Sequence, residues 1–245
     1  MLGMTTTSDP GTTGIKDIAD ALGGGVRENS LIMIEGAAKT GKSVLSQHIA
    51  YGIMSSRGSA VTYFTTDYKP EALIAQMESM SLETRHDIAT DRFRIYHVLP
   101  TEVIKEAEKT LKLIVNQIAE LPSRFKLVVV DSPSLFMTRL NPAVKVDFLQ
   151  SCKELCEGER SIVLTLDTHV FETRTLLRAY AISDYYLKLK PQDVMLDVGQ
   201  IDTRVIKILE VTKLGGVERF GQSGLKFEIK PHMGIQILPF VRIKI

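Results

Sequence analysis

Short runs of apolar residues alternate along this chain with longer stretches in which apolar residues recur every three or four positions. The runs are typical of buried strands and the longer stretches of amphipathic helices. Such alternation predicts an α/β fold, with a mainly parallel central sheet and helices on both faces. The predicted strands are 31–35, 60–65, 93–99, 126–131, 161–167, 185–190 and 204–213, and the predicted helices are 15–22, 42–56, 70–80, 102–121 and 144–157.

The two ends of the chain differ from this central pattern. Residues 1–13 are rich in Thr, Gly, Ser and Pro, which predicts a flexible N-terminal arm. Residues 226–230 and 235–241 are strand-like without an intervening helix, which predicts an antiparallel extension of the sheet at the C-terminus. Because no linker or repeat interrupts the pattern, we expect residues 14–245 to form a single domain.

A glycine-rich motif, G-x-x-x-x-G-K-S, follows the first predicted strand and opens the first long helix. This context predicts a phosphate-binding loop for a nucleoside triphosphate, because the loop amides and the helix N-terminus surround an anion. The lysine is expected to contact the β- and γ-phosphates. The expected nucleotide-binding residues of this loop are Gly36, Ala37, Ala38, Lys39, Thr40, Gly41, Lys42, Ser43 and Val44. The side chain of Lys39 either adds charge near the γ-phosphate or faces water.

A metal-binding partner for this loop is expected at the end of the strand 126–131. Asp131 follows the apolar run Leu-Val-Val-Val, where an aspartate either caps a turn or helps to bind Mg²⁺. Given the phosphate-binding loop, we expect Ser43 and Asp131 to bind Mg²⁺ together with ATP. The order of elements fits P-loop ATPases in which an additional strand, here 161–167, lies between the strands that precede Ser43 and end in Asp131. Residues 165–168 then either sense the γ-phosphate or form a plain turn.

Hydrolysis would require a group that orients or deprotonates water. Asp67, at the end of the strand 60–65, is the candidate base, although it is one methylene shorter than a glutamate. A misplacement of about 1 Å can lower a rate about 100-fold. The adjacent Thr65 and Thr66 could accept a phosphoryl group or only shape the site.

Composition narrows the functional classes. The 245 residues have a formal net charge of +1, whereas nucleic-acid-binding domains usually have a basic excess, so we expect no nucleic-acid partner. Cys152 and Cys156 are expected to be reduced thiols rather than zinc ligands. No apolar stretch is long enough to span a membrane, and we expect a cytoplasmic protein.

The order of these motifs resembles the RecA-like ATPases and, within them, the KaiC group. The glycine triplet at 23–25, the segment 63–71, the Val-Asp-Ser at 130–132 and the segment 178–184 lie where that group has its signatures. Two departures are informative. Asp67 and Tyr68 stand where the group has paired glutamates, and Lys213 keeps the lysine of a Lys-x-Arg pair whose arginine is lost.

A single-domain KaiC-like chain with weakened chemistry is similar to the FlaH (ArlH) family of the archaeal flagellum, or archaellum. The resemblance implies an ATP-binding regulatory and assembly subunit with little or no hydrolysis, which forms a homo-oligomer, a hexameric ring. Lys213 would then contact the nucleotide in trans, from the neighbouring subunit. The implied partners are the hexameric secretion-type motor ATPase, a ring-forming scaffold protein and the membrane platform, beneath which the protein would associate peripherally.

Two other functions share this fold. The first is an active KaiC-like ATPase or autokinase that uses Asp67 as its base. The second is a RecA-type DNA recombination protein, which would need basic DNA-contacting loops. The candidate loop, 171–178, has only two arginines.

Overall fold

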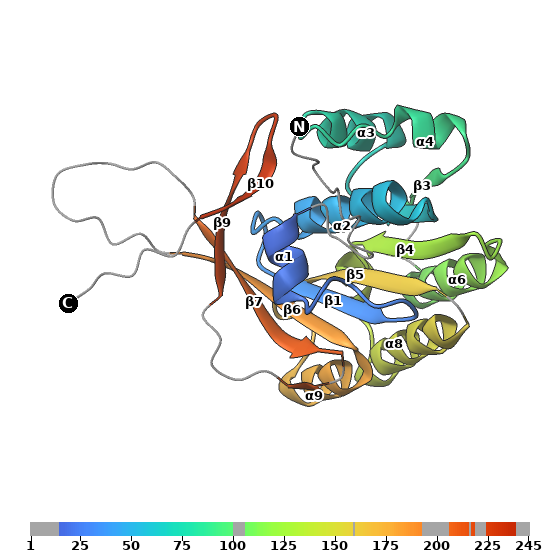
Figure 1. Cartoon of the computed structure of the whole chain (residues 1–245). Coiled ribbons are helices and arrows are strands. Elements are labelled where there is room, and N and C mark those ends of the chain that lie inside the picture. The colour runs from blue at the N-terminus through green and yellow to red at the C-terminus, as the bar shows by residue number, and fades with distance from the viewer. Residues whose placement is uncertain are drawn as a thin grey trace, which may run out of the picture.

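The computed structural model describes residues 15–99, 106–158, 160–192, 206–215, 217–218 and 224–238. Within these residues, ten strands form one sheet in the order β10-β9-β7-β6-β1-β5-β4-β2-β3, and β8 pairs with β7 (Figure 1). The strands are β1 (Leu31–Gly36), β2 (Ala60–Thr65), β3 (Phe93–His97), β4 (Phe125–Asp131), β5 (Ser161–Asp167), β6 (Tyr185–Pro191), β7 (Lys207–Leu214), β8 (Val217–Glu218), β9 (Leu225–Lys230) and β10 (Gly234–Ile237).

The pairing divides the sheet into a parallel part and an antiparallel part. The strands from β6 to β3 pair in parallel. From β6 onward, β7, β9 and β10 pair antiparallel. β5 lies between β1 and β4, in register with Leu31 through Gly36 on one side. The predicted α/β fold with an antiparallel C-terminal extension is therefore confirmed, as is the position of the additional strand.

Helices cover both faces of the sheet. In Figure 1, α1, α2, α3 and α4 lie on one face, and α6, α8 and α9 lie on the other. Pro70 begins α3, and Asn141 caps α8 by accepting the Ala143 N–H at 2.9 Å. The helices are α1 (Lys16–Ala21), α2 (Lys42–Arg57), α3 (Pro70–Glu78), α4 (Arg85–Ala89), α6 (Ala107–Glu120), α7 (Ser134–Met137), α8 (Pro142–Glu157) and α9 (Thr173–Ile182).

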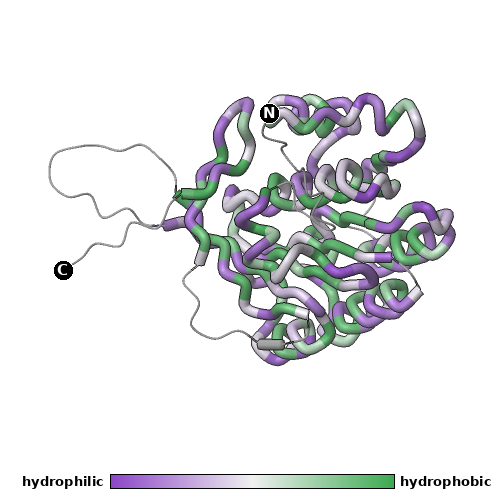
Figure 2. Tube along the Cα trace, in the orientation of Figure 1, coloured by the Kyte–Doolittle hydropathy of each residue, from purple (hydrophilic) through white to green (hydrophobic). Residues whose placement is uncertain are grey.

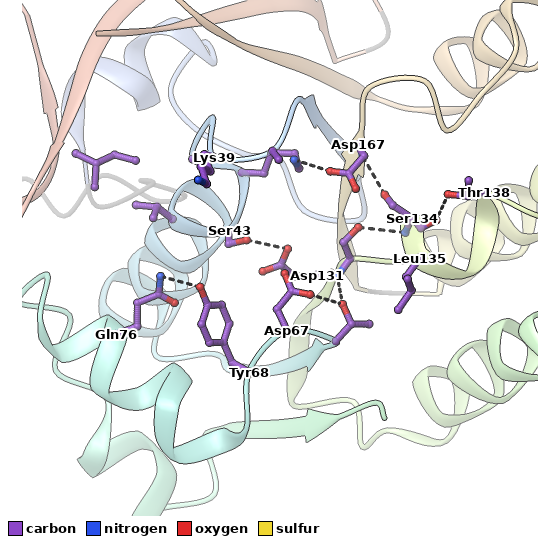
Figure 3. Close-up of a pocket in the computed structure, with 17 residues that line it drawn as sticks. Lys39, Ser43, Asp67, Tyr68, Gln76, Asp131, Ser134, Leu135, Thr138 and Asp167 are labelled. Atoms are coloured by element: carbon purple, nitrogen blue, oxygen red, sulfur yellow. Dashed lines mark hydrogen bonds and ion pairs between the residues drawn. The ribbon is translucent and has the colours of Figure 1, made fainter. Parts of the chain in front are cut away.

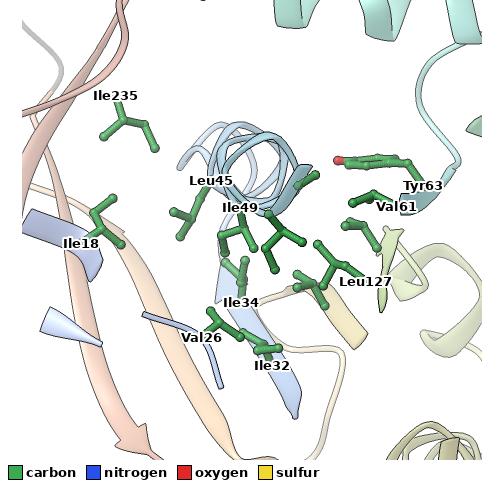
Figure 4. Close-up of a cluster of buried hydrophobic side chains, with 14 of the residues drawn as sticks. Ile18, Val26, Ile32, Ile34, Leu45, Ile49, Val61, Tyr63, Leu127 and Ile235 are labelled. Atoms are coloured by element: carbon green, nitrogen blue, oxygen red, sulfur yellow. The ribbon is translucent and has the colours of Figure 1, made fainter. Parts of the chain in front are cut away.

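The core consists of two hydrophobic clusters, one on each face of the sheet. Successive strand residues alternate between them: Ile32 and Ile34 face α2, whereas Leu31 and Met33 face α6 and α8 with the other cluster. Figure 4 shows Leu45 and Ile49 of α2 above the sheet residues of the first cluster. Figure 2 shows the same distribution as hydrophobic strands in the middle of the molecule. Each large apolar side chain buried in this way contributes about 1.5–3 kcal/mol.

The structure also corrects several expectations. The segment 171–178 is not a loop, because α9 begins at Thr173. The short helices α4 and α7 were not expected either. The N-terminal arm 1–13, the first residues of the predicted helix 102–121, the start of the predicted strand 204–213 and the end of the strand 235–241 lie outside the described residues. In the described part of the chain, no helix combines the length and the apolar character needed to cross a membrane.

Candidate nucleotide-binding site

The loop between β1 and α2 has a backbone that requires glycine at both ends. A Cβ added to Gly36 would lie 2.5 Å from Thr40 Oγ1 and 2.8 Å from the Leu189 carbonyl oxygen. Gly41 is the N-cap residue of α2 and has a φ of 100°, in the left-handed region. The loop therefore leads into the N-terminus of a 16-residue helix, whose unpaired amides and dipole favour a bound anion.

Lys42 points back across this loop. Its ammonium group donates to the carbonyl oxygens of Gly36 at 2.8 Å and Ala37 at 3.0 Å, and it forms an ion pair with Asp167 Oδ1 at 2.8 Å. The lysine side chain is only 8% exposed, whereas the Asp167 side chain is 53% exposed. The expected phosphate-binding lysine is therefore already bound to a carboxylate at the end of β5.

Asp131 ends β4 and lies opposite the start of α2. Its Oδ1 accepts hydrogen bonds from Ser43 Oγ at 3.1 Å and Thr165 Oγ1 at 2.6 Å, and its Oδ2 accepts one from the Tyr63 hydroxyl at 2.7 Å. Burial raises the pKa of Asp131, an effect that the three hydroxyl donors oppose and the nearby Asp67 charge reinforces. The predicted pair of Ser43 and Asp131 is thus in direct contact.

Asp67 and Tyr68 lie just after the end of β2, the strand that pairs with β4 next to Asp131. The backbone amides of both residues donate to Thr65 Oγ1, at 3.3 and 3.2 Å. Thr66 Oγ1 donates to the Asp67 carboxylate at 3.1 Å, and the Tyr68 hydroxyl accepts a long hydrogen bond of 3.5 Å from Gln76 of α3. Thr65 is therefore a turn-forming residue here, fully buried and bonded to the backbone.

These elements surround a pocket of about 560 Å³ (Figure 3), a volume in the range of small-molecule sites. Most of the predicted site residues line it. Gly36, Ala37 and Thr40 belong to the loop without lining the pocket, and Lys213 is elsewhere. The lining residues are Ala38, Lys39, Gly41, Lys42, Ser43, Val44, Thr66, Asp67, Tyr68, Gln76, Asp131, Ser132, Ser134, Leu135, Thr138, Asp167 and Ile229.

Further lining residues come from α3, the end of β5, α7 and β9. The backbone N–H of Asp167 donates to Ser134 Oγ at 2.9 Å, and this hydrogen bond joins the end of β5 to α7. Leu135 lies on α7, and Ile229 comes from β9 of the C-terminal extension. Asp167 lies in the segment 165–168, for which the sequence left open either sensing of the γ-phosphate or a plain turn. No local signal in the sequence indicates that Ile229 reaches this pocket.

Lys213 has a different environment from the one expected for a residue presented to a neighbouring subunit. Its side chain is buried, and its ammonium donates to the carbonyl oxygens of Tyr180 at 2.7 Å, Ala181 at 2.9 Å and Ser183 at 2.5 Å. Such a cation satisfies the carbonyls at the C-terminus of α9 and interacts favourably with its dipole. A contact in trans would require the ammonium to leave these carbonyls, so that role stays a prediction.

His48 on α2 and the two cysteines on α8 do not line this pocket. His48 is a structural residue within this chain: its Nε2 accepts the Ile235 N–H at 3.2 Å, which joins α2 to β10. Cys152 and Cys156 are both buried free thiols on α8. Among the described residues, no group of three or more His, Cys, Asp and Glu side chains could hold a metal ion.

Comparisons with known proteins agree with this architecture over nearly the full chain. The family model described as "ATPase: KaiC" matches residues 11–241. The archaeal flagellar ATP-binding protein FlaH of Sulfolobus acidocaldarius is 28% identical over 93% of this chain and 96% of its own. FlaH of Methanocaldococcus jannaschii is 26% identical over 90% and 91%. The DNA repair and recombination protein RadB of Pyrococcus furiosus is 31% identical, but over only 49% of each chain.

Solved structures show the same fold. The crystal structure of the flagellar accessory protein FlaH from Methanocaldococcus jannaschii superimposes with a TM-score of 0.74 at 22% identity, covering 91% of this chain and 96% of that one. A KaiC-like protein from Pyrococcus horikoshii gives a TM-score of 0.71 at 18% identity, with 93% and 98% coverage. Because the family model spans far more than half of the sequence, the chain belongs to the KaiC family of RecA-like ATPases.

Proposed function

We propose that this protein is the ATP-binding regulatory and assembly subunit of an archaellum motor. In this proposal, ATP binding controls the assembly of a homo-oligomeric ring and its interaction with the hexameric motor ATPase, with little or no hydrolysis. The main support is the relation to two archaeal flagellar FlaH proteins, each over at least 90% of both chains. Its other partners would be a ring-forming scaffold protein and the membrane platform, which it would contact from the cytoplasmic side of the membrane.

ATP is the expected ligand because membership of a P-loop ATPase family implies ATP binding. The amides of the loop before α2 and the N-terminus of that helix would bind the phosphates. Lys42 would contact the β- and γ-phosphates, as the motif requires. The pocket extends from this loop to Tyr68 and Gln76 on one side and to Leu135 on the other, which leaves room for the rest of the nucleotide.

Magnesium fits the donors present. Mg²⁺ prefers hard oxygen ligands and is usually held by one or two carboxylates together with substrate phosphates, rather than by a cage of protein groups. Ser43 Oγ and the Asp131 carboxylate, 3.1 Å apart, are such oxygens at the phosphate end of the pocket. When bound, the ion would neutralise charge on the β- and γ-phosphates. The protein's own contribution is to hold Asp131 ready through Thr165 and Tyr63.

Weak hydrolysis follows from the residues at the end of β2. Asp67 is the carboxylate there, and its side chain is shorter than a glutamate and bonded to Thr66. Tyr68 supplies no second carboxylate. A water molecule between Asp67 and a bound γ-phosphate would therefore be oriented poorly, and misplacement by about 1 Å can lower a rate about 100-fold. ATP would stay bound long enough to act as an assembly signal.

The proposal is tested by Lys42→Ala, assayed for ATP binding by calorimetry and for capture of the motor ATPase. Both activities should be lost together, because bound ligand stabilises the binding-competent state by about 2.7 kcal/mol at 100-fold saturation. Lys112→Ala is the matched control, since this lysine is exposed on α6 and pairs only with Glu108 among its described contacts. If Lys42→Ala bound no ATP and still captured the motor ATPase normally, nucleotide control of assembly would be wrong.

An active ATPase or autokinase is the second candidate, because Asp67 lines the same pocket as Lys42, Ser43 and Asp131. Purified protein would then release phosphate at about 1 s⁻¹ or faster, the usual range for enzymes, and Asp67→Asn would stop the release. Transfer of the phosphoryl group to Thr65 or Thr66 would be detected by mass spectrometry. Phosphate release much slower than this rate, and equally slow in Asp67→Asn, would exclude an active ATPase or autokinase.

DNA recombination is the third candidate, and it rests on the RadB relatives that match about half of the chain. The replacement of the expected DNA-contacting loop by α9 weakens it. Salt-dependent DNA binding with micromolar affinity would favour this function over the archaellum role.

A further inference from the structure

The ammonium group of Lys42 uses every hydrogen it can donate. A lysine ammonium has three N–H donors and no acceptor. In this chain the acceptors are the carbonyl oxygens of Gly36 and Ala37 and the carboxylate of Asp167, at 2.8, 3.0 and 2.8 Å. A phosphate group can therefore bind this ammonium through a hydrogen bond only if one of the three acceptors is released.

The two carbonyl oxygens are held within the loop. The Gly36 carbonyl also accepts the Thr168 N–H at 3.2 Å, which ties the end of β1 to the residue after β5. The Ala37 carbonyl also accepts the Thr40 hydroxyl at 2.8 Å. Releasing either carbonyl from Lys42 would therefore require movement of the backbone that forms the phosphate-binding loop.

The Asp167 carboxylate can leave more easily. Its backbone amide is fixed by Ser134 Oγ at 2.9 Å, but its side chain is 53% exposed. Rotation of the carboxylate moves it from Lys42 into water without disturbing β5. Because water hydrates the freed carboxylate, its release from Lys42 has only a small desolvation cost. Figure 3 shows the ion pair of Asp167 as a dashed line.

We propose that Asp167 is a specificity-determining residue, whose carboxylate competes with the terminal phosphate of the nucleotide for the ammonium group of Lys42. The inference rests on the proposed ATP site and adds a regulator to it. ATP binding breaks the ion pair between Asp167 and Lys42, so the end of β5 distinguishes the bound state from the free state. The same competition weakens ATP binding, because the γ-phosphate must approach a carboxylate that already occupies its partner.

ADP provides the comparison, because it lacks the γ-phosphate. Lys42 contacts the β-phosphate of both nucleotides, but only the γ-phosphate of ATP brings a further negative charge next to Asp167. Repulsion between charges near a protein surface is of the order of the roughly 1.4 kcal/mol that corresponds to a tenfold change in Kd. Asp167→Asn keeps the shape of the side chain and removes its charge. We expect it to bind Mg-ATP about tenfold more tightly than the unchanged protein, and Mg-ADP at most about threefold more tightly.

The experiment is a calorimetric titration of the full chain and of Asp167→Asn with Mg-ATP and with Mg-ADP, and the readout is the ratio of the two affinities. Glu172→Gln is the matched control. Glu172 is also an exposed carboxylate paired with a buried lysine, Lys145 at 3.7 Å, but neither residue lines the nucleotide pocket. It should change the ratio by less than about threefold. A purely structural role for Asp167 would change the urea midpoint without changing the ratio.

Three outcomes would overturn the proposal: no gain in ATP affinity, an equal gain for ATP and ADP, or a weaker affinity that would make Asp167 a contributor to nucleotide binding. An equal change in the ratio for Glu172→Gln would likewise contradict it, because the effect would then come from the net charge of the protein in general. Absence of ATP binding by the unchanged protein would instead refute the proposed ATP site itself.

Discussion

The buried hydroxyl of Tyr63 offers the sharpest test of how the metal-binding end of the pocket is built. The ring is fully buried, and its hydroxyl donates to Asp131 Oδ2 at 2.7 Å while contacting Ser46 Oγ at 2.8 Å. Tyr63→Phe removes this hydroxyl and leaves the ring packed edge-on against Phe93. The substitution therefore removes a hydrogen bond from a buried carboxylate without creating a large cavity.

The size of the expected loss in stability follows from the charge and burial of Asp131. A hydrogen bond to a charged group contributes about 1.5–3 kcal/mol, and an unsatisfied buried acceptor adds a desolvation penalty. We therefore expect Tyr63→Phe to lower the free energy of unfolding by about 2–3 kcal/mol. For a chain of this size, that corresponds to a decrease in Tm of about 5–10 °C.

The assay is urea and thermal unfolding of the apo protein, with Tyr185→Phe as the matched control. Tyr185 is also a fully buried tyrosine of the same hydrophobic cluster, but its hydroxyl accepts a neutral backbone N–H, from Arg27, at 3.1 Å. Its loss should lower the free energy of unfolding by only about 1 kcal/mol. With nucleotide present, Tyr63→Phe should weaken ATP binding in magnesium and leave magnesium-free binding unchanged. If Tyr63→Phe and the unchanged protein had the same urea midpoint and the same Tm, the Tyr63 hydroxyl would not stabilise Asp131.

Two further predictions concern other parts of the fold. Burial lowers the pKa of His48 from 6.5 to about 4. As the pH falls, His48 is therefore protonated in the unfolded chain before it is protonated in the folded protein. The free energy of unfolding, which is at its full value above about pH 6.5, then decreases by up to about 3 kcal/mol as the pH approaches 4. Urea midpoints measured from pH 7.5 to 4.5 test this, and His48→Gln, which can still accept the Ile235 N–H, should remove that component of the pH dependence. Gly41→Ala should lower both stability and ATP affinity, because φ is 100° and the new Cβ would lie 2.8 Å from Ile229 Cδ1. Gly58→Ala, also in the left-handed region but with open space around it, should lower stability by only about 1 kcal/mol and leave ATP affinity unchanged.

Most of the fold was predictable because its signals are local. Apolar runs such as 126–131 are flanked by polar residues, and the helix after the phosphate-binding loop ends at Gly58, which adopts the left-handed conformation. α9 was missed because its sequence, Thr-Arg-Thr-Leu-Leu-Arg-Ala-Tyr-Ala-Ile, begins without a capping side chain. Its packing against α8, a long-range interaction, decides its conformation.

The candidate site was predictable to a similar degree. Ser43 and Asp131 belong to motifs with a strand and a helix around them, so their contact could be inferred. The order of the strands also placed Asp167 beside the phosphate-binding loop, but no local pattern indicates its ion pair with Lys42. The contact of Ile229 with the pocket depends on the arrangement of the C-terminal strands, which no local pattern gives either. The same holds for Lys213, whose three carbonyl partners belong to the end of α9, about 30 residues earlier in the chain.

The most direct test of the central claim is a calorimetric titration of the folded protein with ATP and magnesium, in parallel with Lys42→Ala. We expect one saturable binding event per chain, lost in the variant while both proteins unfold cooperatively. No heat of binding from the well-folded, unchanged protein at millimolar ATP, or equal binding by Lys42→Ala, would contradict an ATP site at the phosphate-binding loop.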